Sequence, residues 1–272
     1  MADEDAAPYE FYPAQYARFG TALAAEIRRE AYGEDLGQQG WRTLAEQDAI
    51  VDMVGRSGAR RVLDIACGSG GPSLAIVART GCTLTGVDIE PEAIARAAGH
   101  ASALRLDGRA NFVIADCSDA LPFSDAEFDM VICVDAVIHL GDRFGVLRDW
   151  FRLLRRGGPL LFTDAAVLTG PLFKAEIDIR ASQGAFVIVP PGVNERAIAA
   201  AGFELLRSED TTSETADIAA RLHAARDKRA MSLIEEEGSA WFHKRQGFLW
   251  MTATLARDHR LSRFRYIAGK PN

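Results

Sequence analysis

The sequence has few cysteines, and they are not arranged as a metal site or a redox pair. Its 272 residues contain four, at positions 67, 82, 117 and 133, with no CxxC pair and no other spacing typical of metal ligands. All four lie in apolar stretches. We therefore predict buried, reduced thiols, no bound metal and a cytoplasmic protein.

An excess of positive charge is also missing. Lys and Arg number 31 against 38 for Asp and Glu, which gives a formal net charge of −7. Proteins that bind a long phosphate backbone draw affinity from clustered cations, so we expect no nucleic-acid partner. No segment approaches the roughly 18 consecutive apolar residues of a membrane span, so we expect no membrane partner. The acidic start, MADEDAAPYEFYPAQ, lacks the apolar stretch of a signal peptide. With 48% hydrophobic residues, the chain is expected to be a soluble enzyme.

From Arg61 onward, short β-branched runs alternate with helical stretches. The runs include RVLDIA, CTLTGVDI, NFVIAD, FDMVICVDAV and PLLFTDAAV. Such alternation predicts βαβ units and a parallel sheet with helices on both faces. We predict a single α/β domain whose Rossmann-like, mostly parallel sheet has seven strands, the last of them antiparallel. Residues 61–212 and 260–272 would form this core, 1–60 an N-terminal helical cover, and 213–259 a helical lid inserted before the last strand.

The segment Val62–Gly71, VLDIACGSGG, carries the clearest functional signal. A strand ending at Asp64 leads into a turn where Gly68 and Gly70 let the backbone approach a ligand closely. Nicotinamide and flavin proteins use a similar turn. Here, however, Ser73 stands where their third small residue would be. The turn by itself leaves the ligand open.

Aspartates end two further strands at the same edge of the predicted sheet. Asp88 follows Gly68 by 20 residues, where a carboxylate can accept both hydroxyls of a ribose. Asp116, followed by Cys117, ends the third strand, where an adenine edge would lie. A dinucleotide does not need this second acid, whereas a single nucleoside with a cationic sulfonium matches carboxylates at three strand ends. The alternative is that these aspartates only cap the helices that follow.

Four segments resemble, in order, the motifs of class I S-adenosylmethionine-dependent methyltransferases: VLDIACGSGG, TGVDIEP, IADCSDALPF and LLRRGGPLLFTD. The resemblance covers residues 61–167 and departs from the family at Ala66, where glycine is more common. It implies that S-adenosylmethionine is the cofactor. It further implies that the turn residues hold the cofactor's amino-acid portion and that the later strand ends hold its ribose and adenine; the residues are Asp64, Ala66, Gly68 and Gly70, then Asp88, Ile89, Asp116 and Cys117.

A closer resemblance is to phosphoethanolamine methyltransferases. The segment Asp135–Leu140, DAVIHL, is very similar to theirs. Gln15-Tyr16 and Gly33-Glu34 resemble the pair that leads their N-terminal helix and the loop that covers their cofactor. The resemblance implies that Gly37 and Gln38 lie nearest the cofactor.

In that family a histidine and a tyrosine close the site, and the histidine helps to deprotonate the nucleophile. The resemblance implies these roles for His139 and Tyr16, with Asp135 and Tyr16 also beside the cofactor. A histidine that titrates near neutrality, within reach of Asp135 or Tyr16, suits proton removal from an amine. The alternative is that His139 is a hydrogen-bonded strand-end residue without a catalytic part.

Tyrosines are scarce where the acceptor is expected to bind. Phosphoethanolamine methyltransferases hold their phosphate with tyrosines after the fifth strand, but here no tyrosine occurs between Tyr32 and Tyr266. Arg180 and Lys174 could hold an anion, although such residues are more often solvated surface charges. We predict a more apolar or aromatic small-molecule acceptor, methylated at nitrogen in preference to oxygen, carbon or sulfur. The side chains behind this prediction lie in the later helical segments: Phe173, Phe186, Val187, Ile188, Trp241, Phe248 and Trp250.

Two other classes of function stay open. A nicotinamide-dependent oxidoreductase would have the third glycine and would not need Asp116. A non-catalytic protein that binds S-adenosylmethionine would have no use for His139 or a lid. We expect a monomer or a homodimer.

Overall fold

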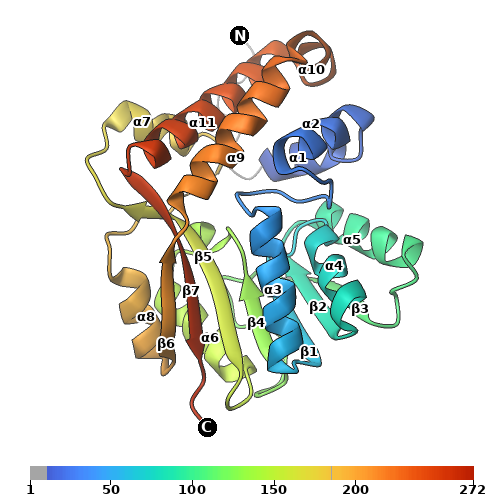
Figure 1. The fold of residues 1–272 in the computed structure, drawn as a ribbon, viewed down its shortest axis with the longest axis vertical. Coiled ribbons are helices and arrows are strands. Elements are labelled where there is room, and N and C mark those ends of the chain that lie inside the picture. The colour runs from blue at the N-terminus through green and yellow to red at the C-terminus, as the bar shows by residue number, and fades with distance from the viewer. Residues whose placement is uncertain (1–10, 185) are drawn as a thin grey trace.

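The computed structural model describes residues 11–184 and 186–272, which build a seven-stranded sheet (Figure 1). The strand order is β3-β2-β1-β4-β5-β7-β6, and β7 runs antiparallel to both of its neighbours, whereas the pairs among β1 to β5 are parallel. This confirms the predicted fold class. The strands are β1 Arg61–Ile65, β2 Thr83–Asp88, β3 Ala110–Ile114, β4 Met130–Cys133, β5 Pro159–Leu168, β6 Glu204–Asp210 and β7 Leu261–Gly269.

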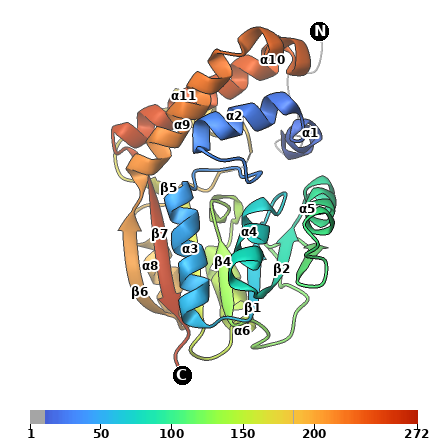
Figure 2. The ribbon, with the colours of Figure 1, turned by 45° about the vertical axis from the view of Figure 1, so that its right-hand side comes forward.

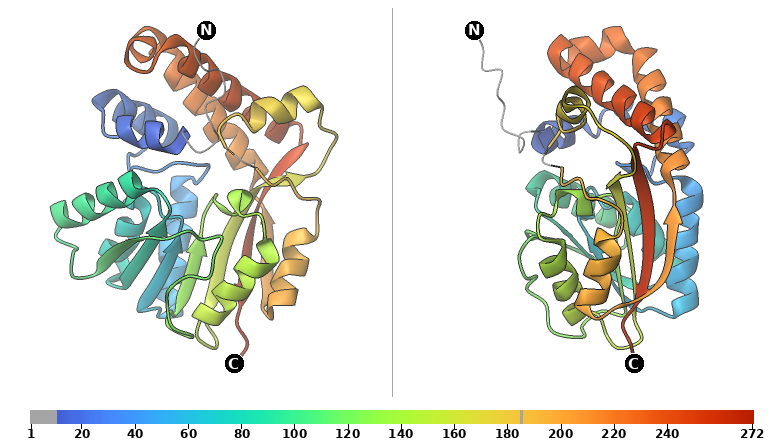
Figure 3. Two further views of the ribbon diagram at one scale, coloured as in Figure 1. Left: turned by 180° about the vertical axis from the view of Figure 1, so that it is seen from behind. Right: turned by 90° about the vertical axis from the view of Figure 1, so that its left-hand side faces the viewer.

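Helices pack on both faces of the sheet because its central strands are apolar on both sides. One apolar cluster joins α3 and α4 to the sheet, and another joins α6 and α8 to the opposite face. Figure 3 shows the second layer from behind. These helices, with α5 beside β2 and β3, are α3 Leu44–Ser57, α4 Gly71–Thr80, α5 Pro91–Ala103, α6 Arg143–Leu153 and α8 Val193–Ala201.

The remaining helices lie beyond the carboxyl ends of the parallel strands (Figure 2). Ile27 and Trp41 share one apolar cluster with Ile218 and Phe248, so the second N-terminal helix and the loop after it pack directly on the late helices. We call residues 11–43 the cover and residues 212–257 the lid. Their helices, together with α7, are α1 Phe11–Arg18, α2 Ala22–Tyr32, α7 Lys174–Arg180, α9 Thr212–Asp227, α10 Ala230–Glu237 and α11 Ser239–Arg257.

Helix α3 does not belong to the cover. Its buried residues Ile50, Val51 and Val54 lie in the apolar cluster of β1, β2 and α4. We therefore end the cover at residue 43 instead of 60; residues 1–10 of the expected cover lie outside the described residues. Within the described ranges, no helix has the length and apolar character needed to cross a bilayer.

Candidate functional site

A cavity of about 330 Å³ lies where β1, β2 and β4 end, below the cover and the lid. The carboxyl ends of parallel strands are the usual place for a ligand in such sheets. The volume falls within the roughly 300–1,000 Å³ of small-molecule sites. Most residues predicted from the sequence line it: Tyr16, Gln38, Ala66, Gly68, Asp88, Ile89, Asp116, Cys117, Asp135 and His139.

The glycine-rich turn forms one wall in left-handed backbone conformation. The φ angle is 54° at Ala66, 57° at Gly68 and 73° at Gly70. The hydroxyl oxygen of Tyr16 lies 2.9 Å from the position that a Cβ atom would take at Gly68. A side chain at Gly68 would therefore meet both backbone strain and Tyr16, which explains the glycine there.

Asp88 connects the turn to the end of β2. Its Oδ2 accepts a hydrogen bond of 2.8 Å from the Gly68 N–H, and its Oδ1 accepts one of 3.0 Å from the Glu90 N–H. Burial raises the pKa of Asp88, against the effect of these N–H donors. Two carboxylate oxygens offer about four acceptor positions, so the group can accept further bonds from ribose hydroxyls.

Ile89 and Asp116 continue this wall. Ile89 is 55% exposed although it is apolar, and it lines the cavity, as expected of a residue that would pack on a base. Asp116 lines the cavity, and its Oδ1 accepts a hydrogen bond of 2.8 Å from the Ser118 N–H. Cys117 is buried beside it. The described part of the chain holds no group of three or more His, Cys, Asp or Glu placed to bind a metal.

Asp64 and Gly70 are not among the residues that line the cavity, so their contact with the cofactor stays a prediction. Oδ2 of Asp64 accepts a hydrogen bond of 2.5 Å from the Ser73 hydroxyl, which anchors the first turn of α4. Gly70 caps that helix. Arg42, which the motifs did not reveal, does line the cavity. Burial raises the pKa of Asp64, and the positive charge of Arg42 opposes this rise.

The loop between α2 and α3 closes over the turn. The Ser69 hydroxyl donates to the Gly37 carbonyl at 2.8 Å, and the carbonyl oxygen of Leu36 lies 1.4 Å from the Cβ position of Gly71. Gln38 lines the cavity, but its amide bonds within the loop, to the Glu34 carbonyl and the Leu36 N–H. Gln38 therefore holds the loop's shape.

The tyrosine that meets His139 is Tyr12, not Tyr16. The Tyr12 hydroxyl and Nε2 of His139 are 2.8 Å apart, and the rings meet edge to face. Tyr12 and Tyr16 are four residues apart on α1, so they share a helix face, and only the earlier one reaches His139. Burial raises the pKa of Tyr12 to about 12, which keeps its phenol protonated at neutral pH. The ring of Phe186 covers His139 at 5.0 Å between centroids.

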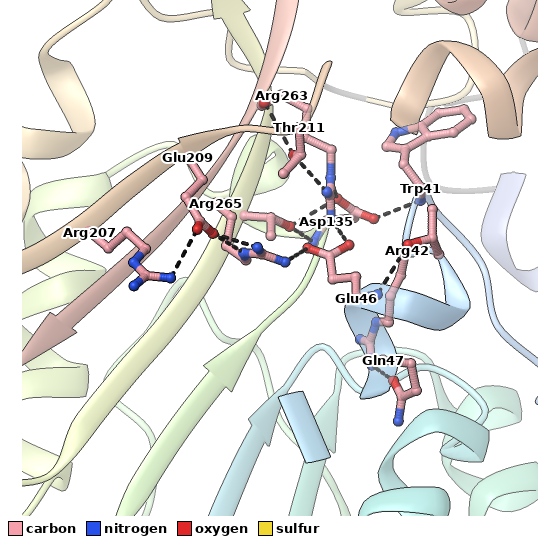
Figure 4. A network of polar contacts seen from close by, with 12 residues as sticks. Trp41, Arg42, Glu46, Gln47, Asp135, Arg207, Glu209, Thr211, Arg263 and Arg265 are labelled. Carbon is pink, nitrogen blue, oxygen red and sulfur yellow. Dashed lines mark hydrogen bonds and ion pairs between the residues drawn. The ribbon is translucent and has the colours of Figure 1, made fainter. Parts of the chain in front are cut away.

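Asp135 is bound to a buried arginine, which corrects the expectation that it assists His139 (Figure 4). Its Oδ1 accepts from Nε of Arg263 at 2.7 Å and from the Thr163 hydroxyl at 2.9 Å, and its Oδ2 accepts from the Trp41 N–H at 2.7 Å. Burial acts to raise the pKa of Asp135, but the Arg263 guanidinium outweighs it and the pKa is lowered. Asp135 is therefore a positioning residue that ties the cover to the core.

The far end of the cavity is aromatic and cationic. Trp41 and Phe248 stack there at 6.1 Å, and Phe186 lies beside them. Arg180 is only 2% exposed, so the expectation of a solvated surface charge is wrong for it; Lys174, in contrast, is exposed and pairs with Asp178. The periodicity of a short helix could not reveal this difference.

S-adenosylmethionine fits these residues. Asp88 offers acceptors to ribose hydroxyls, Ile89 an apolar surface to a base, and Gly68 a backbone that a ligand can approach. The amide oxygen of Gln15 and the amide nitrogen of Gln39 line the same cavity and are buried without hydrogen-bond partners, which indicates that a polar ligand completes them.

Comparisons with known proteins agree with this reading. Residues 62–158 match the family model of a methyltransferase domain. The chain is 29% identical over 203 residues to a 27-O-demethylrifamycin SV methyltransferase of Amycolatopsis mediterranei, covering 70% of this chain and 74% of that protein. It is 30% identical to a sterol 24-C-methyltransferase of Gibberella zeae over 71% of this chain, which spans about half (51%) of that longer protein.

Solved structures share the fold. A phosphoethanolamine N-methyltransferase 2 of Haemonchus contortus, solved with S-adenosyl-L-methionine, has a TM-score of 0.78 at 20% identity, covering 96% of this chain and 60% of that one. The cyclopropane synthase MmaA2 of Mycobacterium tuberculosis has a TM-score of 0.79 at 16% identity, covering 98% and 100%. Motifs, cavity and relatives lead to one conclusion: the chain is a class I S-adenosylmethionine-dependent methyltransferase.

Proposed function

We propose that this enzyme transfers the methyl group of S-adenosylmethionine to a nitrogen or oxygen atom of a small molecule, with nitrogen preferred as the sequence predicts. The observation that carries the proposal is the Tyr12–His139 pair, 2.8 Å apart, in the same cavity as Gly68 and Asp88. An amine or hydroxyl nucleophile must lose a proton when it is methylated, and a histidine in this cavity would take it.

The cofactor supplies an electrophilic methyl group when bound. Asp88 would accept its ribose hydroxyls, Ile89 and Cys117 would contact its base, and Asp116 would face the base's edge. The cover would exclude water from the reacting atoms, since in-line methyl transfer depends on positioning in a dry site.

His139 would take the proton from the nucleophile on Nδ1, in the tautomer whose Nε2–H donates to the Tyr12 hydroxyl oxygen. Tyr12 orients its ring by hydrogen bonding to Nε2, and Phe186 limits the ring's freedom. Because burial keeps the phenol of Tyr12 protonated at neutral pH, Tyr12 does not compete as the base.

The test is a transfer screen with methyl-labelled S-adenosylmethionine against amines, phenols, thiols and small acids, with His139→Ala measured beside the wild type. Calorimetry with S-adenosylhomocysteine and with NADH separates the other classes. Binding of NADH without S-adenosylhomocysteine would favour the oxidoreductase. Binding of S-adenosylhomocysteine with no transfer to any acceptor would favour the non-catalytic protein. A cytoplasmic location and a monomeric or homodimeric state stay predictions.

A further inference from the structure

Buried hydrogen-bond donors without partners gather at the aromatic end of the cavity. Nε and Nη1 of Arg180 and the amide nitrogen of Gln183 lack partners among the described residues. Both side chains are 2% exposed, and both line the cavity. Leaving such donors unmet is costly, and it is costliest for a charged group. Three donors on one wall indicate that a ligand supplies the acceptors.

The carboxylates near Arg180 are already engaged. Asp135 is bound by Arg263, Thr163 and the Trp41 N–H. Asp164 accepts 2.9 Å and 2.8 Å hydrogen bonds from Arg143 and Asn194. Each of these aspartates is bound by another buried arginine, so both attract the Arg180 guanidinium electrostatically but neither accepts a hydrogen bond from its Nε or Nη1.

Aromatic rings surround the Arg180 guanidinium instead. Its central carbon lies 4.5 Å from the ring centroid of Phe186, 4.8 Å from that of Phe248 and 6.0 Å from that of Trp41. Cation–π contacts compensate part of the lost hydration but accept no hydrogen bond along the guanidinium edge. Burial lowers the pKa of Arg180 to about 10, which still leaves the group charged at neutral pH.

We propose that Arg180 and Gln183 bind a carboxylate of the methyl acceptor, whose apolar body packs on Trp41, Phe186 and Phe248. The proposal rests on the proposed function, because it names the class of acceptor for the same site. A planar carboxylate can accept two parallel hydrogen bonds from the edge of a guanidinium group, and so it suits the donors of Arg180. Arg245, a half-buried arginine that also lines the cavity, donates to the side-chain oxygen of Gln183 and so orients the amide nitrogen of Gln183.

The proposed anion site lies close to His139, where methyl transfer is proposed. The ring centroid of Phe186 is 4.5 Å from the central guanidinium carbon of Arg180 and 5.0 Å from the ring centroid of His139. One aromatic ring therefore separates the anion site from the predicted base. An acceptor with its carboxylate and its nucleophile at opposite ends of a small planar body would satisfy both.

The binding test uses benzoate, phenylacetate and 4-hydroxybenzoate, each beside its neutral amide, and phenyl phosphate. Affinity is measured by calorimetry at constant ionic strength, with saturating S-adenosylhomocysteine. We expect at least one carboxylate to bind about ten-fold or more tightly than its amide. Equal affinity of every acid and amide would overturn the proposal. Tighter binding of phenyl phosphate than of all the acids would overturn the carboxylate assignment.

Two variants assign the effect to the residue. Arg180→Met should abolish the preference for the acid and should raise the thermal midpoint of the ligand-free protein by about 2–4 °C, because it removes an uncompensated buried charge. Arg257→Gln, an exposed arginine on α11, is the matched control and should change neither quantity. Retention of the acid preference in Arg180→Met would contradict the role of Arg180.

The two proposals can fail separately. If the wild type binds benzoate but transfers no methyl group to any acceptor, the proposed function is contradicted and the anion site is not. Efficient transfer to neutral acceptors, with no preference for acids and no change in Arg180→Met, would confirm the function and reject the anion site.

Discussion

Oδ1 of Asp135 and Nε of Arg263 are 2.7 Å apart, although 128 residues separate them in the chain. Nη2 of Arg263 also donates to Glu46 on α3 at 2.8 Å, and its Nη1 donates to the Thr211 hydroxyl at 2.9 Å. Arg263 is completely buried. The guanidinium of Arg263 thus connects β7 to Asp135, which lines the cavity, and to Glu46 on α3 (Figure 4).

Asp135→Asn should lower the free energy of unfolding at pH 7 by about 3–5 kcal/mol, because it removes the charge that compensates Arg263. The lowered pKa of Asp135 means that the folded state favours the ionised carboxyl. Its contribution is therefore complete above the unfolded-state pKa of about 3.9 and is lost as the pH falls through the lower folded-state value. Denaturant titrations between pH 3 and 8 measure the difference between wild type and variant.

The matched control for that series is Asp52→Asn, an exposed residue on α3. It should leave the free energy of unfolding within about 0.5 kcal/mol of the wild type. A wild-type advantage over Asp135→Asn that does not shrink at acid pH would contradict the ion-pair explanation.

His139→Ala should lower kcat by about 10²–10⁴-fold and leave the affinity for S-adenosylhomocysteine nearly unchanged, since general base catalysis contributes that much. Steady-state kinetics and calorimetry measure the two quantities. Equal kcat in wild type and variant would make His139 a structural residue.

Substitutions of the two tyrosines of α1 should have different effects on kcat and on cofactor affinity in the same assays. Tyr12→Phe removes the hydroxyl beside His139 and should reduce kcat by roughly 2–10-fold, the worth of one hydrogen bond. Tyr16→Phe should act on cofactor affinity instead, because that hydroxyl lies against the Gly68 turn. If Tyr16→Phe lowered kcat while Tyr12→Phe did not, the assignment of Tyr12 would be wrong.

Asp88→Ala should weaken binding of S-adenosylhomocysteine by about 1–3 kcal/mol, because ribose hydroxyls and the Gly68 N–H both lose an acceptor. Calorimetry measures the change, and Asp52→Ala serves as the control for loss of a carboxylate. Unchanged affinity would reject the ribose role of Asp88.

Gly71→Ala tests how the cover closes. The added methyl group would collide with the Leu36 carbonyl and push the loop off the turn, at a cost of about 1–3 kcal/mol in cofactor affinity. Gly99→Ala, on the exposed side of α5 with no atom within 4 Å of its Cβ position, should instead stabilise the fold by about 0.5–1 kcal/mol. Similar cofactor affinity in both variants would show that the loop does not seal the site through this contact.

Local patterns were sufficient for the sheet and for much of the cofactor side of the cavity. Strands β1, β2 and β7 follow apolar runs whose bounds the sequence marks, and the glycines of the turn adopt left-handed backbone as their identity predicts. Asp88 and Asp116 reach one cavity because parallel strands end at one edge. Such features depend on residues near one another in the chain.

The acceptor side of the cavity could not be predicted from the sequence, because it is formed by contacts between residues far apart in the chain. Whether Tyr12 or Tyr16 meets His139 depends on where α1 lies relative to His139. Tyr12 and His139 are 127 residues apart in the chain. Asp135 looked available to His139 in the sequence, yet Arg263 from the last strand engages it. Nothing near Arg180 in the chain distinguishes it from exposed Lys174.

The glycine-rich turn and the strand-end aspartates predicted a small nucleoside cofactor in an α/β sheet, and the lack of an excess of positive charge predicted no nucleic-acid partner. These are properties of composition and of local backbone geometry. Only the tertiary structure decided which tyrosine meets His139, which carboxylate is engaged and which arginine is left without an acceptor. Those outcomes depend on burial and on charge pairing between distant segments, because a buried charge is compensated by whatever group the folded chain brings beside it.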